Sequence, residues 1–409
     1  MELRFLGGAS KVGSLGMTLT DGPRKLLFDY GMTPSDPPEY PLPIPPGITH
    51  AFISHAHLDH IGMAPLITRD GANAFATHMT RQLAELMLED ALKVARLEGY
   101  PSQYSNHDVR HLLGRLRAVE PEGTVSVGGA EVSLTPAGHV PGATMFLYRG
   151  SRDVLFTGDV QSHPTHLVGG WKPVPCDVLV MESTYAGKEH EDRALTEERL
   201  RQSVMAVVDR GGQVLLPAFA MGRSQELMMV LEDLDLEIWI DGMARAVCDI
   251  YDRNRSVLRD PRAFKRALSR VEIVQEAAER HDALRYADVI LTPSGMLDGG
   301  PSLFYLGTIA KDPKSAVFLS GYQVEGSNGR DLVEKGTLTV GGVTVRPTCQ
   351  VEKFDFSAHA GHSDLLELAR QTHPKTVVLM HGDQREVLRA DLEKEFEVIL
   401  PTEGTGTEL

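Results

Sequence analysis

Residues His55, His57, Asp59 and His60 form the run H-x-H-x-D-H, which places four metal-competent side chains within six residues. A helix or a strand cannot direct all four toward one ion, whereas a tight loop at the end of a buried strand can. The preceding segment Ala51–Ser54 is apolar and partly β-branched, which predicts that strand. His55 and His57 would face one way and Asp59 and His60 another, which favours two adjacent ions. Imidazole and carboxylate ligands without cysteine favour zinc, with manganese as the alternative.

Three further candidate ligands, His139, Asp159 and His381, lie well downstream of this run. Each follows an apolar stretch that predicts a strand, and each has a glycine beside it that lets the backbone turn tightly near a metal. Strand ends that meet at one edge of a sheet sandwich would bring these loops together. Asp29 also follows an apolar stretch, and we expect it to orient a ligand histidine rather than to bind metal.

Composition limits the class of protein. The chain has 409 residues and a formal net charge of −15, which argues mildly against bulk affinity for nucleic acid but leaves room for a local basic cleft. No apolar run reaches the length of a membrane span, so we expect no membrane association. Three scattered cysteines predict a cytoplasmic location and no disulfide framework.

The pattern of predicted secondary structure changes near Leu195. Before it, short strand patterns alternate with glycine and proline turns, and helical patterns occupy about 81–98 and 107–116. From Leu195 onward helices and strands alternate, as in the strand Val214–Pro217 followed by the helix Ser224–Leu234. Alternation of this kind predicts a parallel sheet flanked by helices.

Taken in order, Asp29, the H-x-H-x-D-H run and the three later ligands resemble the metallo-β-lactamase fold, an αββα sandwich with its metals at one edge. The gap between the last two ligands (381 − 159 = 222 positions) holds the alternating segment, and this resembles the β-CASP branch, which acts on nucleic acids. The resemblance implies an α/β chain in which residues 1–190 and 351–409 form the sandwich. Residues 191–350 would form an inserted parallel-sheet α/β domain, the β-CASP domain.

Additional β-CASP motifs can be placed residue by residue. Glu182, in Met-Glu-Ser-Thr-Tyr, matches the acidic first motif, and His359, in Phe-Ser-Ala-His-Ala, matches the second. His381 matches the third, where a histidine resembles RNA-specific rather than DNA-specific members. The whole pattern is most similar to archaeal-type relatives of the cleavage and polyadenylation nuclease and to ribonuclease J.

The resemblance also implies how the ligands divide between two zinc ions. One ion takes His55, His57 and His139, the other takes Asp59, His60 and His381, and Asp159 bridges them. A water that the two metals activate would attack phosphorus. His359 would protonate the leaving oxygen, while Glu182 holds the ring and keeps it protonated. The implied catalytic residues are Asp59, Glu182 and His359, and His362 is expected to lie directly behind the ligands.

Two short motifs are candidates for contact with substrate phosphates. Ser294-Gly295 and Ser320-Gly321 each follow an apolar strand, where small residues and free backbone N–H groups can cradle phosphate. Arg223 and Arg330 would contact the nucleic-acid backbone. The alternative is that these segments are ordinary turns and surface arginines.

The function that we expect is that of a metal-dependent ribonuclease in RNA processing or decay, with RNA as the substrate. Endonucleolytic cleavage, 5′-to-3′ exonucleolysis and a combination of both stay open, as does assembly into a homodimer or an RNA-processing complex. The alternatives are a DNA-processing nuclease of the same branch, a small-ester hydrolase and a non-catalytic scaffold subunit. His381 argues against the DNA-processing nuclease, and the inserted segment argues against the small-ester hydrolase. The complete ligand set argues against the scaffold subunit.

Overall fold

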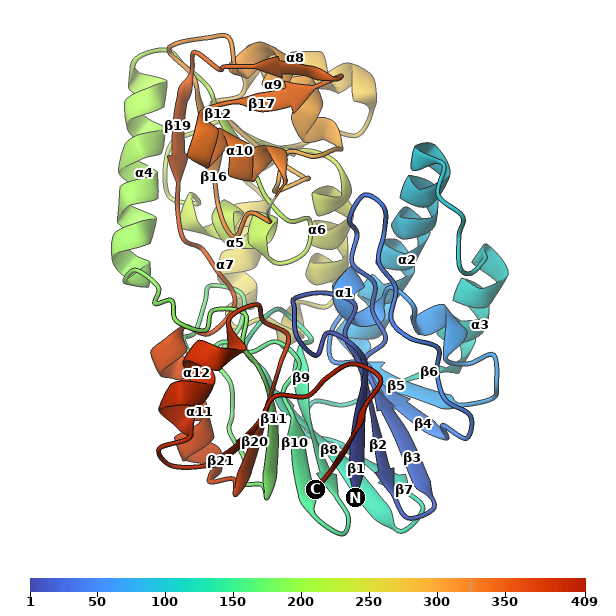
Figure 1. Ribbon diagram of the computed structural model, residues 1–409. Helices are drawn as coiled ribbons and strands as arrows, with labels where there is room; N and C mark the ends of the chain where they lie inside the picture. Colours follow the sequence, from blue (N-terminus) through green and yellow to red (C-terminus); the bar gives the residue numbers. More distant parts are fainter. Residues whose placement is uncertain (325) are drawn as a thin grey trace. The chain divides into compact units, whose positions relative to one another are not determined.

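A computed structural model describes residues 1–324 and 326–409 of the chain (Figure 1). The described residues form two compact units. Unit 1 consists of Met1–Pro164, Val168–Glu189 and His359–Leu409, and unit 2 consists of Thr165–Leu167 and His190–Ala358. The domain boundaries expected at 190 and 350 stay a prediction.

Unit 1 contains two seven-stranded sheets. The first has the order β22-β1-β2-β3-β4-β5-β6 and the second has the order β21-β20-β11-β10-β9-β8-β7. The strands of the first sheet are β1 (Glu2–Gly7), β2 (Gly16–Asp21), β3 (Arg24–Phe28), β4 (His50–Phe52), β5 (Asn73–Thr77), β6 (Leu116–Val119) and β22 (Gly406–Glu408). Those of the second are β7 (Thr124–Val127), β8 (Ala130–Pro136), β9 (Thr144–Arg149), β10 (Asp153–Phe156), β11 (Val178–Glu182), β20 (Thr376–Met380) and β21 (Glu397–Ile399). Because β22 pairs with β1, both ends of the chain lie in the same sheet (Figure 1).

The two sheets pack face to face through a shared aromatic core. Phe28 and Phe52 of the first sheet and Phe146 and Phe156 of the second belong to one cluster of buried side chains. The ring of Phe28 lies 5.3 Å from that of Phe156, and the ring of Phe52 lies 5.4 Å from that of Phe146. Burial of these large rings makes a major contribution to the stability of the sandwich.

Helices cover the outer face of each sheet (Figure 1). α2 (His78–Glu98) and α3 (Asn106–Arg115) cover the first sheet, and α11 (His362–Thr372) and α12 (Arg385–Leu392) cover the second. The side chain of Thr77 caps α2, so this helix begins before the start at 81 that hydrophobic periodicity predicted. The αββα sandwich expected from the sequence is thereby confirmed.

Unit 2 is built on a parallel sheet of six strands in the order β14-β13-β15-β12-β16-β19. Its strands are β12 (Val214–Pro217), β13 (Ile238–Ile240), β14 (Val271–Ile273), β15 (Val289–Thr292), β16 (Ala316–Leu319) and β19 (Gln350–Lys353). Its helices are α4 (Arg193–Asp209), α5 (Arg223–Val230), α6 (Met243–Arg253), α7 (Pro261–Leu268), α8 (Arg280–Tyr286), α9 (Pro301–Ile309) and α10 (Asn328–Lys335), and β17 (Leu338–Val340) and β18 (Val343–Val345) form a separate hairpin. The inserted parallel sheet is therefore confirmed as well. No helix formed by the described residues is long and apolar enough to cross a membrane.

Candidate metal centre

The H-x-H-x-D-H run forms the loop between β4 and the short helix α1 (Leu58–Ile61). Asp29, at the end of β3, is fully buried and anchors this loop. Its Oδ1 accepts a hydrogen bond of 2.7 Å from the Ser54 N–H, and its Oδ2 lies 2.7 Å from both Ser54 Oγ and His60 Nδ1. The carboxylate fixes the orientation of the His60 ring, so that Nε2 is directed toward Asp59 and Asp159. This geometry is compatible with the orienting role expected of Asp29, which stays a prediction.

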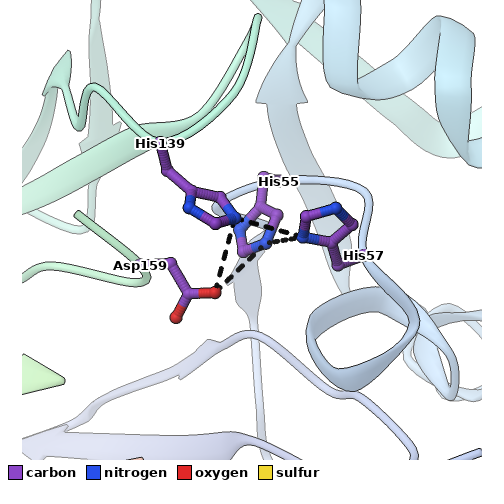
Figure 2. A group of neighbouring side chains, drawn as sticks. All are labelled: His55, His57, His139 and Asp159. Carbon is purple, nitrogen blue, oxygen red and sulfur yellow. Dashed lines mark hydrogen bonds and ion pairs between the residues drawn. The ribbon is translucent and has the colours of Figure 1, made fainter. Parts of the chain in front are cut away.

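Four side chains form a first cluster, in which His55, His57, His139 and Asp159 converge from three different loops (Figure 2). His57 Nδ1 lies 3.0 Å from His55 Nε2 and 3.2 Å from His139 Nε2. Asp159 Oδ2 lies 3.6 Å from His55 Nε2 and 3.7 Å from His139 Nε2. These separations suit ligand atoms around a single ion, because each atom would lie about 2 Å from its centre.

A second cluster joins Asp59, His60 and His381. Asp59 Oδ2 lies 3.9 Å from His60 Nε2 and 3.5 Å from His381 Nε2. Asp159 also borders this group, since its Oδ2 lies 3.2 Å from His60 Nε2 and its Oδ1 lies 3.4 Å from His381 Nδ1. The structure therefore brings all seven expected ligands together, with Asp159 next to both clusters.

Two buried side-chain atoms in these clusters are better explained by a bound metal than by a hydrogen bond within the protein. Within the described chain, His60 Nε2 and Asp159 Oδ1 are buried and have no hydrogen-bond partner. Such groups are costly unless something else satisfies them. Burial, together with the neighbouring His60, lowers the pKa of His55. Burial alone would raise the pKa of Asp159, but the combined charges of His60, His359 and His381 outweigh it and hold this pKa well below its usual range. Neutral imidazole and ionised carboxylate are the forms that bind metals, so the residues fit the metal that the sequence predicts.

Glycines let the strand ends approach the clusters. Gly138 has a φ of 79°, and a Cβ there would lie 2.2 Å from the carbonyl oxygen of Gln161. Gly158 has a φ of 55°, and a Cβ there would lie 2.7 Å from the side chain of Ser54. A larger residue at either position would therefore displace His139 or Asp159.

Glu182 and His359 form a pair beside the ligands. Glu182 ends β11 and is fully buried, and its Oε1 accepts a 2.7 Å hydrogen bond from the Val160 N–H. His359 Nδ1 lies 3.1 Å and 3.0 Å from the two carboxylate oxygens of Glu182, and its Nε2 lies 3.9 Å from Asp159 Oδ2. Burial alone would lower the pKa of His359, but the charges of Glu182 and Asp159 outweigh it and raise this pKa to about 9.

His362 does not join this site. It begins α11, where its Nδ1 accepts a 2.9 Å hydrogen bond from the Gly187 N–H and its Nε2 lies 3.1 Å from Asp391 Oδ2. The expectation that it lies directly behind the ligands is therefore not met, because the start of the helix turns its ring toward α12.

The expected phosphate-contacting residues lie in unit 2, at the carboxyl ends of neighbouring parallel strands. Ser294 and Gly295 follow β15, and Ser320 and Gly321 follow β16, while Arg223 begins α5 after β12. Within the described chain, the backbone N–H groups of Gly295 and Gly321 have no hydrogen-bond acceptor. Such free donors at sheet ends are suited to an anion.

The two arginines differ in their surroundings. Arg223 is only 9% exposed, and its Nη1 donates a hydrogen bond to the carbonyl oxygen of Ser320. It is therefore not an ordinary surface arginine, and a Cβ on Gly321 would lie 2.6 Å from the same Nη1. Arg330 lies on α10 and pairs with Glu334 one turn along that helix. Of the two arginines, Arg223 is the one whose side chain contacts a serine–glycine motif directly.

Two residues that bond to these sites were not identified from the sequence. Gln323 is buried, and its Nε2 donates hydrogen bonds to the carbonyl oxygens of Gly295 (3.2 Å) and Gly321 (3.3 Å), so it ties the two glycine loops together. Gly13 donates its N–H to His381 Nε2 over 3.1 Å. The only signal for Gln323 was its place three residues after Ser320, and a backbone donor such as Gly13 leaves no signal in the sequence.

Comparison with known proteins places the chain among characterised families. Family models match it as metallo-beta-lactamase superfamily at residues 19–204, Beta-Casp domain at 224–332 and Zn-dependent metallo-hydrolase RNA specificity domain at 344–401. A protein of Methanocaldococcus jannaschii named "Probable RNase MJ4" is 32% identical over 99% of both chains. "RNase aCSPSF2" of Saccharolobus solfataricus is 35% identical over 98% of this chain and 84% of its own. A crystal structure of a protein of unknown function from Enterococcus faecalis has the same fold, with a TM-score of 0.63 at 16% identity over 100% of this chain and 99% of that one.

Proposed function

The chain belongs to the β-CASP branch of the metallo-β-lactamase superfamily, and from this membership and the geometry of its site we propose that it is a metal-dependent ribonuclease. The observation that carries the proposal is the convergence of two ligand clusters on Asp159, with the Glu182–His359 pair beside them. The relatives named as RNases support RNA as the substrate class.

We propose that two zinc ions occupy the clusters, held by His55, His57 and His139 on one side and by Asp59, His60 and His381 on the other, with Asp159 bridging. Bound metals would lower the pKa of a water and offset the charge that develops on the phosphate. The chain itself supplies the rigid frame, because Asp29 fixes the ring of His60 and glycines bring His139 and Asp159 close. No ligand needs to change its position in the fold to face the others.

His359 is proposed to protonate the leaving oxygen of the phosphodiester. Its Nδ1 is held by Glu182, so that Nε2 is the nitrogen that faces the ligands. A pKa of about 9 means that this nitrogen carries a proton at neutral pH. An alkoxide is a poor leaving group in water, and a positioned acid contributes typically 10²–10⁴-fold to the rate of such a step.

Unit 2 is proposed to hold substrate phosphate at the loops after β15 and β16. The free N–H groups of Gly295 and Gly321 supply donors, and the guanidinium of Arg223 supplies positive charge beside Gly321. Gln323 fixes the separation of the two glycine loops by bonding to both. Ser294 remains a proposed hydroxyl donor, whereas Ser320 Oγ already donates to the Pro217 carbonyl at 3.1 Å. Arg330 is paired with Glu334, so we propose a weaker role for it.

The test is the cleavage of labelled single-stranded RNA with 5′-monophosphate, 5′-hydroxyl or 5′-triphosphate ends, with and without added zinc or manganese. His55→Ala serves as the control that lacks a ligand. Mononucleotide released from the monophosphate substrate alone would identify a 5′-to-3′ exonuclease, and internal fragments that do not depend on the 5′ group would identify an endonuclease. Absence of any metal-dependent product would overturn the proposed activity.

A further inference from the structure

The proposed function assigns no role to one aromatic ring at the carboxyl ends of the strands in the unit 2 sheet. Phe219 lies two residues after the end of β12, and it is 39% exposed although it is a large apolar side chain. Its backbone is held in place, because Ser224 donates both its N–H (3.1 Å) and its Oγ (2.8 Å) to the Phe219 carbonyl oxygen. The exposure of the ring is therefore a feature of a fixed loop.

Phe219 lies next to the proposed phosphate donors. A Cβ added to Gly295 would lie 3.1 Å from the backbone nitrogen of Phe219, so these two segments run in direct contact. Within the described chain, the Phe219 N–H has no acceptor, as is also true of Gly295. The ring thus emerges beside a group of free backbone donors.

The topology of the sheet puts this edge where ligands bind in open parallel sheets. β12 is a central strand, with β15, β13 and β14 on one side and β16 and β19 on the other. The chain goes from β12 toward β13 on the first side and from β15 toward β16 on the second, so the direction of the connections reverses between the neighbouring strands β12 and β15. Ligands of open α/β sheets bind at the carboxyl ends of the strands where the order reverses. Phe219 lies in the loop that leaves β12 at that place.

Other exposed aromatic rings of unit 2 have partners, whereas Phe219 has none. Phe304, with a similar exposure of 37%, meets His281 edge to face at 5.3 Å and Tyr305 at 5.4 Å. Tyr286 has the guanidinium of Arg285 over its ring at 5.1 Å. For Phe219, the described residues provide neither an aromatic nor a cationic neighbour. Its face is free for a planar group that the protein itself does not supply.

We infer that Phe219 stacks on a base of the bound RNA strand, adjacent to a phosphate held by the backbone donors of the neighbouring loops. The inference rests on the proposed ribonuclease function and adds a residue that contacts the nucleobase. Single-stranded RNA offers unstacked bases, and stacking on an aromatic side chain tolerates any sequence because every base has a flat face. Phe219 therefore strengthens binding of single strands without selecting a sequence.

The experiment measures binding of a short labelled RNA by fluorescence anisotropy in the slow-cleaving background of His359→Ala. One base at a time is removed from the RNA, leaving an abasic ribose at each position in turn. Phe219→Ala is compared with Phe219→Leu, which keeps an apolar side chain, and with Phe219→Trp, which keeps an aromatic face. Phe304→Ala is the matched control, because it removes an equally exposed ring from α9 of the same unit.

With Phe219 present, we expect one abasic position to weaken binding by about 5- to 100-fold. Phe219→Ala should weaken binding of intact RNA by a similar factor and should make that same abasic position neutral. Phe219→Leu should behave nearly like Phe219→Ala, whereas Phe219→Trp and Phe304→Ala should bind normally.

Three results would overturn the inference. Equal binding by Phe219→Ala and its parent would refute stacking and leave the ribonuclease function standing, as would an abasic profile that the substitution does not change. Failure of the unsubstituted chain to bind or cleave any RNA would refute the proposed function and the stacking together. Unchanged thermal unfolding of the Phe219 variants would show that lost binding does not reflect a misfolded loop.

Discussion

The pairing of Glu182 with His359 makes a quantitative prediction for Glu182→Gln. The structure gives His359 a pKa of about 9 against an ordinary value of 6.5, which corresponds to roughly 3 kcal/mol in favour of the protonated ring. Glu182 shares this effect with Asp159 and Asp59. Bound cations would offset the charges of those two aspartates, so in the proposed loaded enzyme Glu182 would be the carboxylate that keeps His359 protonated.

Glutamine keeps the volume of Glu182 and can still accept the hydrogen bond from Val160, but it carries no charge. We therefore expect Glu182→Gln to shift the alkaline limb of the kcat/KM profile for RNA cleavage downward by roughly 1 to 2 pH units. At pH 8 to 9 the rate should fall by about 10- to 100-fold, with a smaller loss near pH 6. The loss arises because fewer molecules hold the proton that the leaving oxygen requires.

The assay follows cleavage of a labelled single-stranded RNA between about pH 5.5 and 10, with metal content measured by elemental analysis at each pH. Asp391→Asn is the control, since it removes the carboxylate that lies 3.1 Å from His362 in the same unit, outside the metal site. An alkaline limb that stays in place in a Glu182→Gln protein with full metal content would refute the assigned role of Glu182. A shift of equal size in Asp391→Asn would show that the effect is not local.

The same pair affects the stability of the metal-free protein. The pKa of His359 is raised in the folded state, so its contribution to stability is fully present below pH 6.5 and is lost as the pH rises through about 9. Glu182→Gln should therefore destabilise the metal-free protein more at pH 6 than at pH 9.5. Urea unfolding at the two pH values measures this difference.

Three further predictions concern the frame of the site and the stability of the sandwich. Asp29→Asn should weaken metal binding by about 10- to 100-fold in a chelator competition, because it removes the carboxylate that orients His60. His381→Ala should lose metal as measured by elemental analysis, and full metal content would contradict its assignment as a ligand. Hydrogen bonds from Tyr148 and Ser151 outweigh burial and hold the pKa of Asp21 well below its usual range, so its contribution to stability is present above pH 3.8 and is lost as the pH falls below it. Asp21→Asn should therefore cost about 1–3 kcal/mol of unfolding free energy at pH 7 and much less near pH 2.

The sequence by itself determined the class of fold and identified the candidate metal ligands. The H-x-H-x-D-H run and the later ligands could be identified because metal binding requires particular residue types, and a turn after a strand requires small residues at particular spacings. The alternation of helices and strands after Leu195 predicted the parallel sheet, because the period of the hydrophobic pattern follows the secondary structure. Errors at element ends, such as the start of α2, came from capping by Thr77, which hydrophobic periodicity does not report.

Only the tertiary structure decided which side chains meet. His362 lies three positions after His359, yet the start of α11 directs its ring to Asp391 and away from the ligands. Arg223 and Arg330 are the same type of residue, but Arg223 is buried against Ser320, whereas Arg330 pairs with Glu334 on its own helix. Gln323 and Phe219 gained their proposed roles from loops that follow different strands of one sheet. Spacing along the chain fixes the direction of a side chain only within its own element, whereas contacts between loops depend on the order in which the strands pair.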